Sequence, residues 1–215
     1  MNAIEKEIVL FDGKNIYQDP YKHISVQKVL SPIHANEILN WLEHTDLFLR
    51  RNENNNKSNE FIVKDDNCPK DLRFLVSSKG LKFFKIQLEK LFQITFEDNF
   101  ILSAVKHEPG DGTSIHSDYA NIHERSQNFF THRFLVYLNR QWSEEDGGML
   151  GLFASKDSSS LIKVISPLHN TGIGIAFGKN SYHAVGKICN GNRYSLVFTL
   201  KSMDGCYEEE IQRSI

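Results

Sequence analysis

From about Phe100 onward, the chain consists of short apolar runs, each too short to form a helix of ordinary length. The runs are rich in Val, Ile, Phe and Tyr, and Gly, Asn, Asp and Pro separate them. This texture is typical of an all-β barrel or sandwich, because each run can form one strand and each separator one turn. The predicted strands are 100–107, 133–138, 149–153, 162–166, 172–177, 182–187 and 193–201.

The first half of the chain mixes strand and helix patterns. An alternating run from His23 to Leu30 predicts a strand, and Ser31-Pro32 is typical of a helix cap followed by a first-turn proline. The polar stretch 50–60 contains no apolar residue, so we interpret it as an exposed loop without a function. A second helix is predicted where five apolar residues share one stripe, namely Leu81, Phe84, Leu88, Leu91 and Phe92.

The domain organisation is expected to be simple. The 215 residues fit one large domain better than two small ones, and no linker or internal repeat divides them. We therefore predict a single domain over 1–215. Within it, 1–98 is a strand and helical support region, 99–201 is the β core and 202–215 is a C-terminal tail.

Charge and cysteine content exclude several classes of protein. Lys and Arg number 25 against 27 Asp and Glu, so no overall charge favours nucleic acid or an anionic membrane. The start of the chain lacks a secretory pattern, and no run of about 18 apolar residues could span a membrane. Cys68, Cys189 and Cys206 show no metal-binding spacing and suit reduced thiols. We expect a cytoplasmic protein without nucleic-acid or membrane partners, whose oligomeric state the sequence does not indicate.

The first chemical motif is His116-Ser117-Asp118, which follows the turn-forming stretch 109–112 (PGDG). On a strand, residues two apart point to the same face, so the imidazole and the carboxylate could bind one metal ion. His44-Thr45-Asp46 has the same letters but lies at the end of a predicted helix. Residues two apart on a helix point in different directions, so we interpret this copy as a solvated helix end.

Two further residues complete a candidate site. His183 lies in the strand-like run SYHAVGKI, and Arg193 follows ten residues later. Taken singly, each has an ordinary structural interpretation, as a core histidine or a surface arginine. Together with the earlier motif, however, two histidines and one carboxylate form the facial triad that suits Fe(II) and leaves coordination positions open. An inward arginine nearby could bind an anion through two parallel hydrogen bonds.

The runs HEPGDGTSIHSD, RFLVYLNRQW, EEDGGMLGLF and YHAVGKICNGNRYSLVFTL occur in this order. As a set they resemble the catalytic core of the Fe(II)/2-oxoglutarate-dependent dioxygenases, in the prolyl-4-hydroxylase-like branch. The resemblance covers about residues 100–201. It implies an α+β, mainly β fold, a double-stranded β-helix (jelly roll) with supporting N-terminal helices. The strands carrying His183 and Arg193 would then belong to opposite sheets and face one cavity.

The resemblance also implies roles for individual residues. The iron ligands would be His116, Asp118 and His183. Four residues would bind or line the site of 2-oxoglutarate, namely Arg193 and Tyr137 at its far carboxylate, with Ser195 assisting and Leu150 beside it. His107 stands where the family has a tyrosine, nine residues before the first ligand. Its role stays open between a hydrogen-bond donor toward cosubstrate or substrate and an ordinary structural residue.

Residues on the substrate side are less directly indicated. Alternation along the strand 133–138 places Arg133 on the inward face with Tyr137. The segment 119–131 follows the aspartate ligand, and Tyr119, Phe129 and Phe130 could close over a substrate or simply pack against the barrel.

The activity implied by the resemblance is hydroxylation of an unactivated C–H bond, coupled to conversion of 2-oxoglutarate and O₂ into succinate and CO₂. Fe(II) would be the metal, with ascorbate as an optional reductant. The presence of Asp118 disfavours halogenation, and Thr199 replaces a second arginine of the nucleic-acid demethylases. The substrate would be an amino-acid or peptidyl side chain, prolyl by analogy, or alternatively a small natural product. The rival from another class is a non-catalytic jelly-roll binding module.

Overall fold

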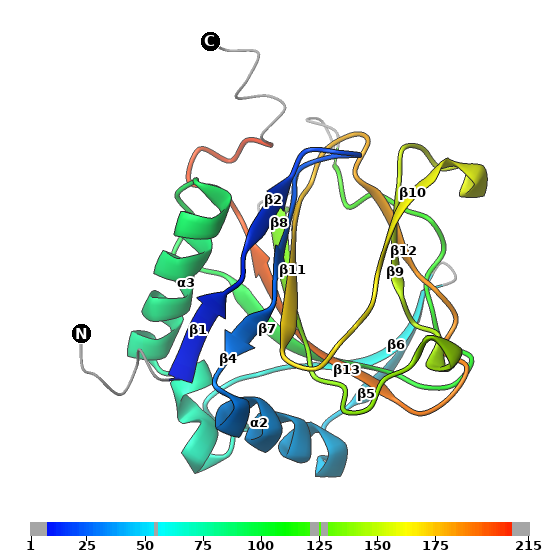
Figure 1. The fold of residues 1–215 in the computed structure, drawn as a ribbon. Coiled ribbons are helices and arrows are strands. Elements are labelled where there is room, and N and C mark those ends of the chain that lie inside the picture. The colour runs from blue at the N-terminus through cyan, green and yellow to red at the C-terminus, as the bar shows by residue number, and fades with distance from the viewer. Residues whose placement is uncertain (1–7, 54–55, 121–124, 126–128, 208–215) are drawn as a thin grey trace.

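The computed structural model describes residues 8–53, 56–120, 125 and 129–207, and in it two antiparallel sheets face each other (Figure 1). The strands are β1 (Val9–Asp12), β2 (Asn15–Tyr17), β3 (His23–Val26), β4 (Lys28–Leu30), β5 (Leu49–Glu53), β6 (Asn56–Ile62), β7 (Ile101–His107), β8 (His132–Tyr137), β9 (Leu150–Phe153), β10 (Leu161–Ile165), β11 (Thr171–Ala176), β12 (Tyr182–Val185) and β13 (Arg193–Leu200). The predicted strands of the second half are therefore confirmed to within two residues at each end.

The larger sheet has the order β2-β3-β11-β8-β13-β7-β6-β5, and the smaller sheet has the order β10-β9-β12. From β8 to β13 the chain moves between the two sheets, so that β12 and β13 lie in different sheets. A short pair, β1 and β4, stands apart. This arrangement confirms the mainly β jelly roll and the expectation that His183 and Arg193 come from opposite walls.

The central strand β13 shows how the large sheet separates a core face from a cavity face. All of its residues are buried. One alternate set belongs to the hydrophobic core beneath the helices, namely Tyr194, Leu196, Phe198 and Leu200. The other set lines a cavity between the sheets, namely Arg193, Ser195, Val197 and Thr199. Because side chains alternate along a strand, β13 contributes to the hydrophobic core with one face and to the cavity with the other.

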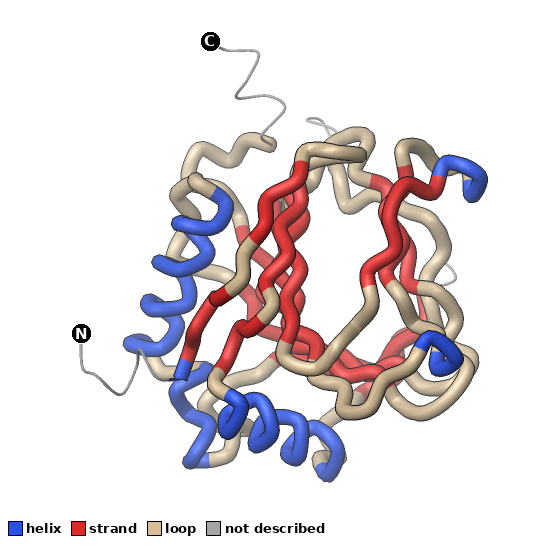
Figure 2. The backbone as a smooth tube through the Cα atoms, in the orientation of Figure 1, coloured by secondary structure: helices blue, strands red, loops and turns tan. Residues whose placement is uncertain are grey.

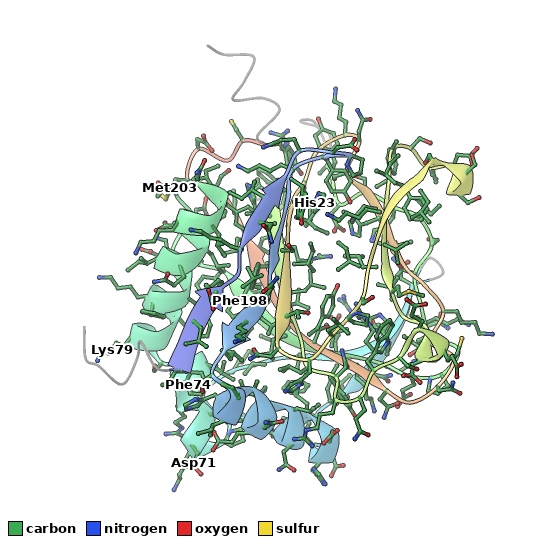
Figure 3. All side chains as sticks on the ribbon, viewed as in Figure 1. His23, Asp71, Phe74, Lys79, Phe198 and Met203 are labelled. Carbon is green, nitrogen blue, oxygen red and sulfur yellow. The ribbon has the colours of Figure 1, made fainter. Side chains whose placement is uncertain are left out.

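Two long helices, α2 (Pro32–His44) and α3 (Ser78–Phe92), lie along only one of the two walls of strands (Figure 2). As predicted, the Ser31 side chain caps α2 by accepting a hydrogen bond from the backbone N–H of His34. The apolar stripe of α3 faces the sheet, on the side where Phe198 of β13 lies (Figure 3). The rings of Phe84 and Phe198 are in contact, with centroids 5.0 Å apart. His44 is exposed at the end of α2, as expected of a solvated helix end.

The described part of the chain also contains three short 3-10 turns, at Lys70–Leu75, Glu144–Asp146 and Ser158–Ser160. In the part of the chain that the structure describes, no helix is both long enough and apolar enough to cross a membrane.

The interpretation of 50–60 as an exposed loop is wrong. This stretch forms most of the hairpin β5–β6, in which Leu49 pairs with Glu60 and Arg51 with Ser58, and residues 54–55 lie outside the described residues. Strand β6 also pairs with β7, so the hairpin extends the large sheet. Its residues are polar because one face lines the cavity and the hairpin forms the open edge of the sheet, where polar side chains are favoured.

The hairpin is fastened to the turn that precedes His116. Arg50 donates two hydrogen bonds to Asp111, at 2.6 and 2.7 Å, and the backbone N–H of Glu108 donates to the same carboxylate. Burial by itself would raise the pKa of Asp111, but the hydrogen bonds from Arg50 and the backbone outweigh it and hold the pKa below its usual value. This ion pair therefore connects the sheet edge to the segment that carries the candidate metal ligands.

We predict that Arg50→Ala destabilises the protein by about 1–2 kcal/mol, the scale of a hydrogen bond to a charged group, reduced because Arg50 is half exposed. The matched control is Arg51→Ala, which removes the exposed pair with Glu60 and should cost less than about 1 kcal/mol. Chemical denaturation of both variants measures the difference. Equal losses would show that the Arg50–Asp111 pair has no special structural role.

Candidate active site

The candidate metal site is built on a cross-strand pair of histidines. The backbone N–H of His116 donates to the carbonyl of His183 at 3.1 Å, and the reverse hydrogen bond is 2.9 Å long. This reciprocal pairing sets two side chains next to each other on one face, and the ring centroids are 4.5 Å apart. Asp118, two residues further along, places Oδ2 at 3.4 Å from Nε2 of His183. One ligand atom from each of the three residues lies within 4.8 Å of the others.

Each imidazole is held in one orientation by its Nδ1. Nδ1 of His116 lies 2.8 Å from the carbonyl of Ser114, and Nδ1 of His183 lies 3.0 Å from the carbonyl of Ser181. Because a carbonyl can only accept, each Nδ1 carries the proton and Nε2 keeps its lone pair. Both rings are therefore prepared to bind a metal ion through Nε2.

The charge state of the cluster also suits a divalent cation. Burial and the neighbouring His183 lower the pKa of His116, so that this ring is neutral near pH 7. Burial alone would raise the pKa of Asp118, but the guanidinium of Arg133, at 2.9 Å, keeps that pKa well below its usual value. Neutral imidazoles and an ionised carboxylate are the forms that coordinate metals.

A cavity of about 500 Å³ opens beside this cluster, between the two sheets. Arg193 lies in its wall and is only 2% exposed. Nε and Nη2 of Arg193, the Tyr137 hydroxyl and the Ser195 hydroxyl are all buried without a hydrogen-bond partner. The charge of Arg193 attracts the Tyr137 hydroxyl, but no hydrogen bond of good geometry joins the two. An anion bound here would satisfy all three side chains at once.

The glycine pair before β9 lets the backbone pass close to this arginine. Gly148 has a φ of +71°, and a Cβ atom added to it would lie 2.9 Å from Cδ of Arg193 and 2.3 Å from Cδ1 of Ile188. Two residues on, Leu150 is buried and contributes to the cavity wall. The backbone just before β9 therefore lies directly against the Arg193 side chain.

His107 contacts the arginine of the site. It lies opposite Arg193 in the pairing of β7 with β13, and its Nδ1 is 3.3 Å from Nη1 of Arg193. Burial, and then the charge of Arg193, lowers the pKa of His107 to about 3. The ring is therefore neutral at ordinary pH, and its Nδ1 is an acceptor that orients the guanidinium.

The predicted substrate-side residues are placed differently from one another. Phe130 lines the cavity. Tyr119 and Phe129 instead pack on Tyr207, with ring centroids 4.7 and 6.0 Å away, and Tyr207 is fully buried. The start of the C-terminal tail thus anchors both ends of the 119–131 segment. Its middle, 121–124 and 126–128, lies outside the described residues, so the proposed closure over a substrate stays a prediction.

The hairpin β5–β6 supplies cavity residues that were not predicted. Arg51 and Glu60 form an ion pair of 2.9 Å in the cavity wall. Alternate residues of β6 also line the cavity, namely Asn56, Ser58, Glu60 and Ile62. These residues are spaced two apart, as on one face of a strand. The spacing could have indicated them in the sequence, but only if the polar stretch had been considered as a strand.

The fold and the site together define a jelly-roll protein with a candidate two-histidine, one-carboxylate metal site and a buried arginine nearby. Residues 102–200 match the family model described as the 2OG-Fe(II) oxygenase superfamily. This match confirms the resemblance seen in the motifs and supports a 2-oxoglutarate-dependent dioxygenase. Oxygenases of this superfamily use Fe(II), 2-oxoglutarate and O₂. No curated protein sequence matches the chain.

Solved structures share the fold. A prolyl-4-hydroxylase of Pseudomonas putida has a TM-score of 0.59 and 16% identity, over 78% of this chain and 83% of that one. A prolyl hydroxylase of Trichoplax adhaerens, in complex with a peptide fragment of the hypoxia inducible factor oxygen degradation domain, has a TM-score of 0.63 and 14% identity, over 87% and 84%. A viral collagen prolyl hydroxylase of Paramecium Bursaria Chlorella virus-1 has a TM-score of 0.61 and 16% identity, over 84% and 96%.

We predict that Arg193→Lys weakens 2-oxoglutarate binding by about tenfold or more, because lysine keeps the charge but loses the planar pair of donors. Calorimetry with Mn(II) and 2-oxoglutarate measures the change. Arg51→Lys, at the exposed pair of the cavity wall, should leave the affinity unchanged. An unchanged affinity in a folded Arg193→Lys protein would mean that another residue anchors the cosubstrate.

A second prediction concerns His107. His107→Phe removes the acceptor for Arg193 and should weaken 2-oxoglutarate binding by about threefold to tenfold, whereas His107→Gln keeps an acceptor and should restore most of it. Because the pKa of His107 is about 3, wild-type His107 stays neutral, and the affinity ratio of wild type to His107→Gln should be constant between about pH 5.5 and 8. A ratio that changes near pH 6.5 would contradict this assignment.

Proposed function

We propose that this protein is a 2-oxoglutarate-dependent dioxygenase that hydroxylates an unactivated C–H bond of an amino-acid or peptidyl side chain and converts 2-oxoglutarate and O₂ into succinate and CO₂. The observation that carries this proposal is the group of unpartnered polar atoms on Arg193, Tyr137 and Ser195. Arg193 and Ser195 line the same cavity as the candidate metal ligands. Such a group fits the far carboxylate of 2-oxoglutarate. The prolyl hydroxylases among the structural neighbours favour an amino-acid side chain as the target.

In this proposal, His116, Asp118 and His183 hold Fe(II), which supplies the activation of O₂ and leaves coordination positions for the cosubstrate. Arg193 binds and orients 2-oxoglutarate through its far carboxylate, with Tyr137 and Ser195 donating to the same group. The apolar wall around Leu150 excludes water from the reacting atoms. The fixed Nδ1 hydrogen bonds keep both imidazoles in place, so binding needs little rearrangement of the ligands.

The substrate side of the proposal uses the rest of the cavity. Arg133 and Phe130 line the part beside the candidate metal ligands, and His107 supports Arg193. Tyr119 and Phe129, at the two ends of the 119–131 segment, would contribute apolar surface on the substrate side. Ascorbate would keep the iron reduced between turnovers.

The test is spectroscopic. We expect the anaerobic protein with Fe(II) and 2-oxoglutarate to show the weak visible metal-to-ligand band of a chelated 2-oxo acid, and His183→Ala to abolish it. His44→Ala, in the exposed copy of the motif, is the matched control and should leave the band intact. A band of full strength in folded His183→Ala protein would overturn the assignment of the site.

A further inference from the structure

Arg133 projects from β8 into the cavity beside the candidate metal ligands. Its Nη1 lies 2.9 Å from Oδ2 of Asp118, and that same oxygen is 3.4 Å from Nε2 of His183. The guanidinium carbon lies 5.4 Å from the centroid of the Phe177 ring, and Nε makes no hydrogen bond. The side chain lines the cavity and keeps 31% of its surface exposed, so a molecule in the cavity can reach it.

The ion pair with Asp118 uses the oxygen that faces the candidate metal position. A divalent cation held by His116, Asp118 and His183 competes for this negative charge and repels the nearby guanidinium. A charge inside a protein is costly unless an opposite charge or several hydrogen bonds compensate it. In the metal-loaded protein, the pair with Asp118 is weakened, and Arg133 becomes available to another anionic partner.

The charges of the residues that line the cavity also favour an anionic partner for Arg133. Among the described residues that line it, three arginines stand against two carboxylates, namely Arg51, Arg133 and Arg193 against Glu60 and Asp118. Arg51 and Glu60 already pair with each other. A divalent metal and the dianion of 2-oxoglutarate cancel, and metal-bound histidines are neutral. One positive charge remains in the loaded cavity, and it lies on the substrate side.

2-Oxoglutarate cannot fill this need while Arg193 holds it. Arg133 pairs with Thr199 of β13, six residues from Arg193 on the same strand, whereas Tyr137 pairs with Ser195. Six residues of strand span roughly 20 Å, so the two arginines lie toward opposite ends of the sheet face. The candidate metal ligands contact the Arg133 end through Asp118. The two cations therefore serve two different ligands.

We infer that Arg133 binds a carboxylate of the substrate, and that the substrate is a small free carboxylic acid, such as a free amino acid, instead of an uncharged peptide segment. This inference rests on the proposed function, because it requires the metal and 2-oxoglutarate to occupy their places. Since Arg133 and the metal ligands share Asp118, the carbons next to the substrate carboxylate are the ones held closest to the metal. Arg133 is thereby a specificity-determining residue for an acid over its amide.

The experiment uses Mn(II) as a paramagnetic substitute for Fe(II), with saturating 2-oxoglutarate, and two fluorinated probes of nearly equal size. Trifluoroacetate carries the carboxylate, and trifluoroacetamide is its neutral analogue. We expect Mn(II) to broaden the ¹⁹F line of trifluoroacetate far more than that of the amide. In Arg133→Gln the excess broadening should fall by about tenfold or more, the scale of a lost charge-assisted hydrogen bond. Arg133→Lys should give an intermediate value.

Arg51→Gln is the matched control, because it removes another cavity arginine and should leave the excess broadening unchanged. Calorimetry first checks that each protein binds Mn(II) and 2-oxoglutarate. If wild-type protein binds both Mn(II) and 2-oxoglutarate but broadens the ¹⁹F lines of the acid and the amide equally, or broadens neither line, the role of Arg133 is contradicted and the proposed function is not. Excess broadening that is undiminished in Arg133→Gln also contradicts the role of Arg133. Wild-type protein that binds neither Mn(II) nor 2-oxoglutarate contradicts the proposed function, and the inference with it.

Discussion

The buried positive charge of Arg193 is the constraint on which the arrangement of the cavity depends. The side chain is 2% exposed, and among the described residues no carboxylate pairs with it. Its protein neighbours are a neutral imidazole, His107, and the ring of Tyr137, whose centroid lies 4.8 Å from the guanidinium carbon, and neither carries a negative charge. A guanidinium left in this state is unfavourable in the free protein. The packing of β13 against the hydrophobic core beneath the two helices stabilises the fold and compensates for the unfavourable burial of this charge.

Most of the fold could be predicted from the sequence because its strands have one apolar face. In β13 and β8 the core side and the cavity side alternate, so the strand pattern persists even where the cavity side carries Arg193 or Arg133. The helix α3 was visible for a similar reason, since its stripe repeats with the period of a helix. For the candidate site, order along the chain was sufficient to select His116, Asp118 and His183. Their proximity, however, depends on the hydrogen bonds between His116 and His183, which only the structure shows.

Other features depend on contacts between distant segments, and local pattern does not indicate them. The hairpin β5–β6 has no apolar face within 50–60, because its inward side chains meet a polar cavity instead of a core. Asp111, which pairs with Arg50 of this hairpin, lies 61 residues further along the chain. The sequence around Asp111 predicts a turn but not this ion pair. The contact of Arg133 with Asp118 also joins segments that are not adjacent in the sequence. Alternation along the strand predicts that Arg133 points inward, but its partner depends on the path of the chain after His116.

The two inward arginines divide the floor of the cavity into a cosubstrate end and a substrate end. Across β7, β13 and β8 the facing rows run from His107 and Arg193, through Ser195 and Tyr137, to Val197 and Leu135, and finally to Thr199 and Arg133. Charge therefore stands at both ends of the floor, and an apolar row separates the ends. An apolar surface does not hold a charged group but accommodates hydrocarbon. 2-Oxoglutarate anchored at the Arg193 end would place its two methylene carbons along this row and its 2-oxo acid end toward the candidate metal ligands. An acid anchored at the Arg133 end would place its hydrocarbon part toward the same row, and the small sheet faces the floor from the other side of the cavity.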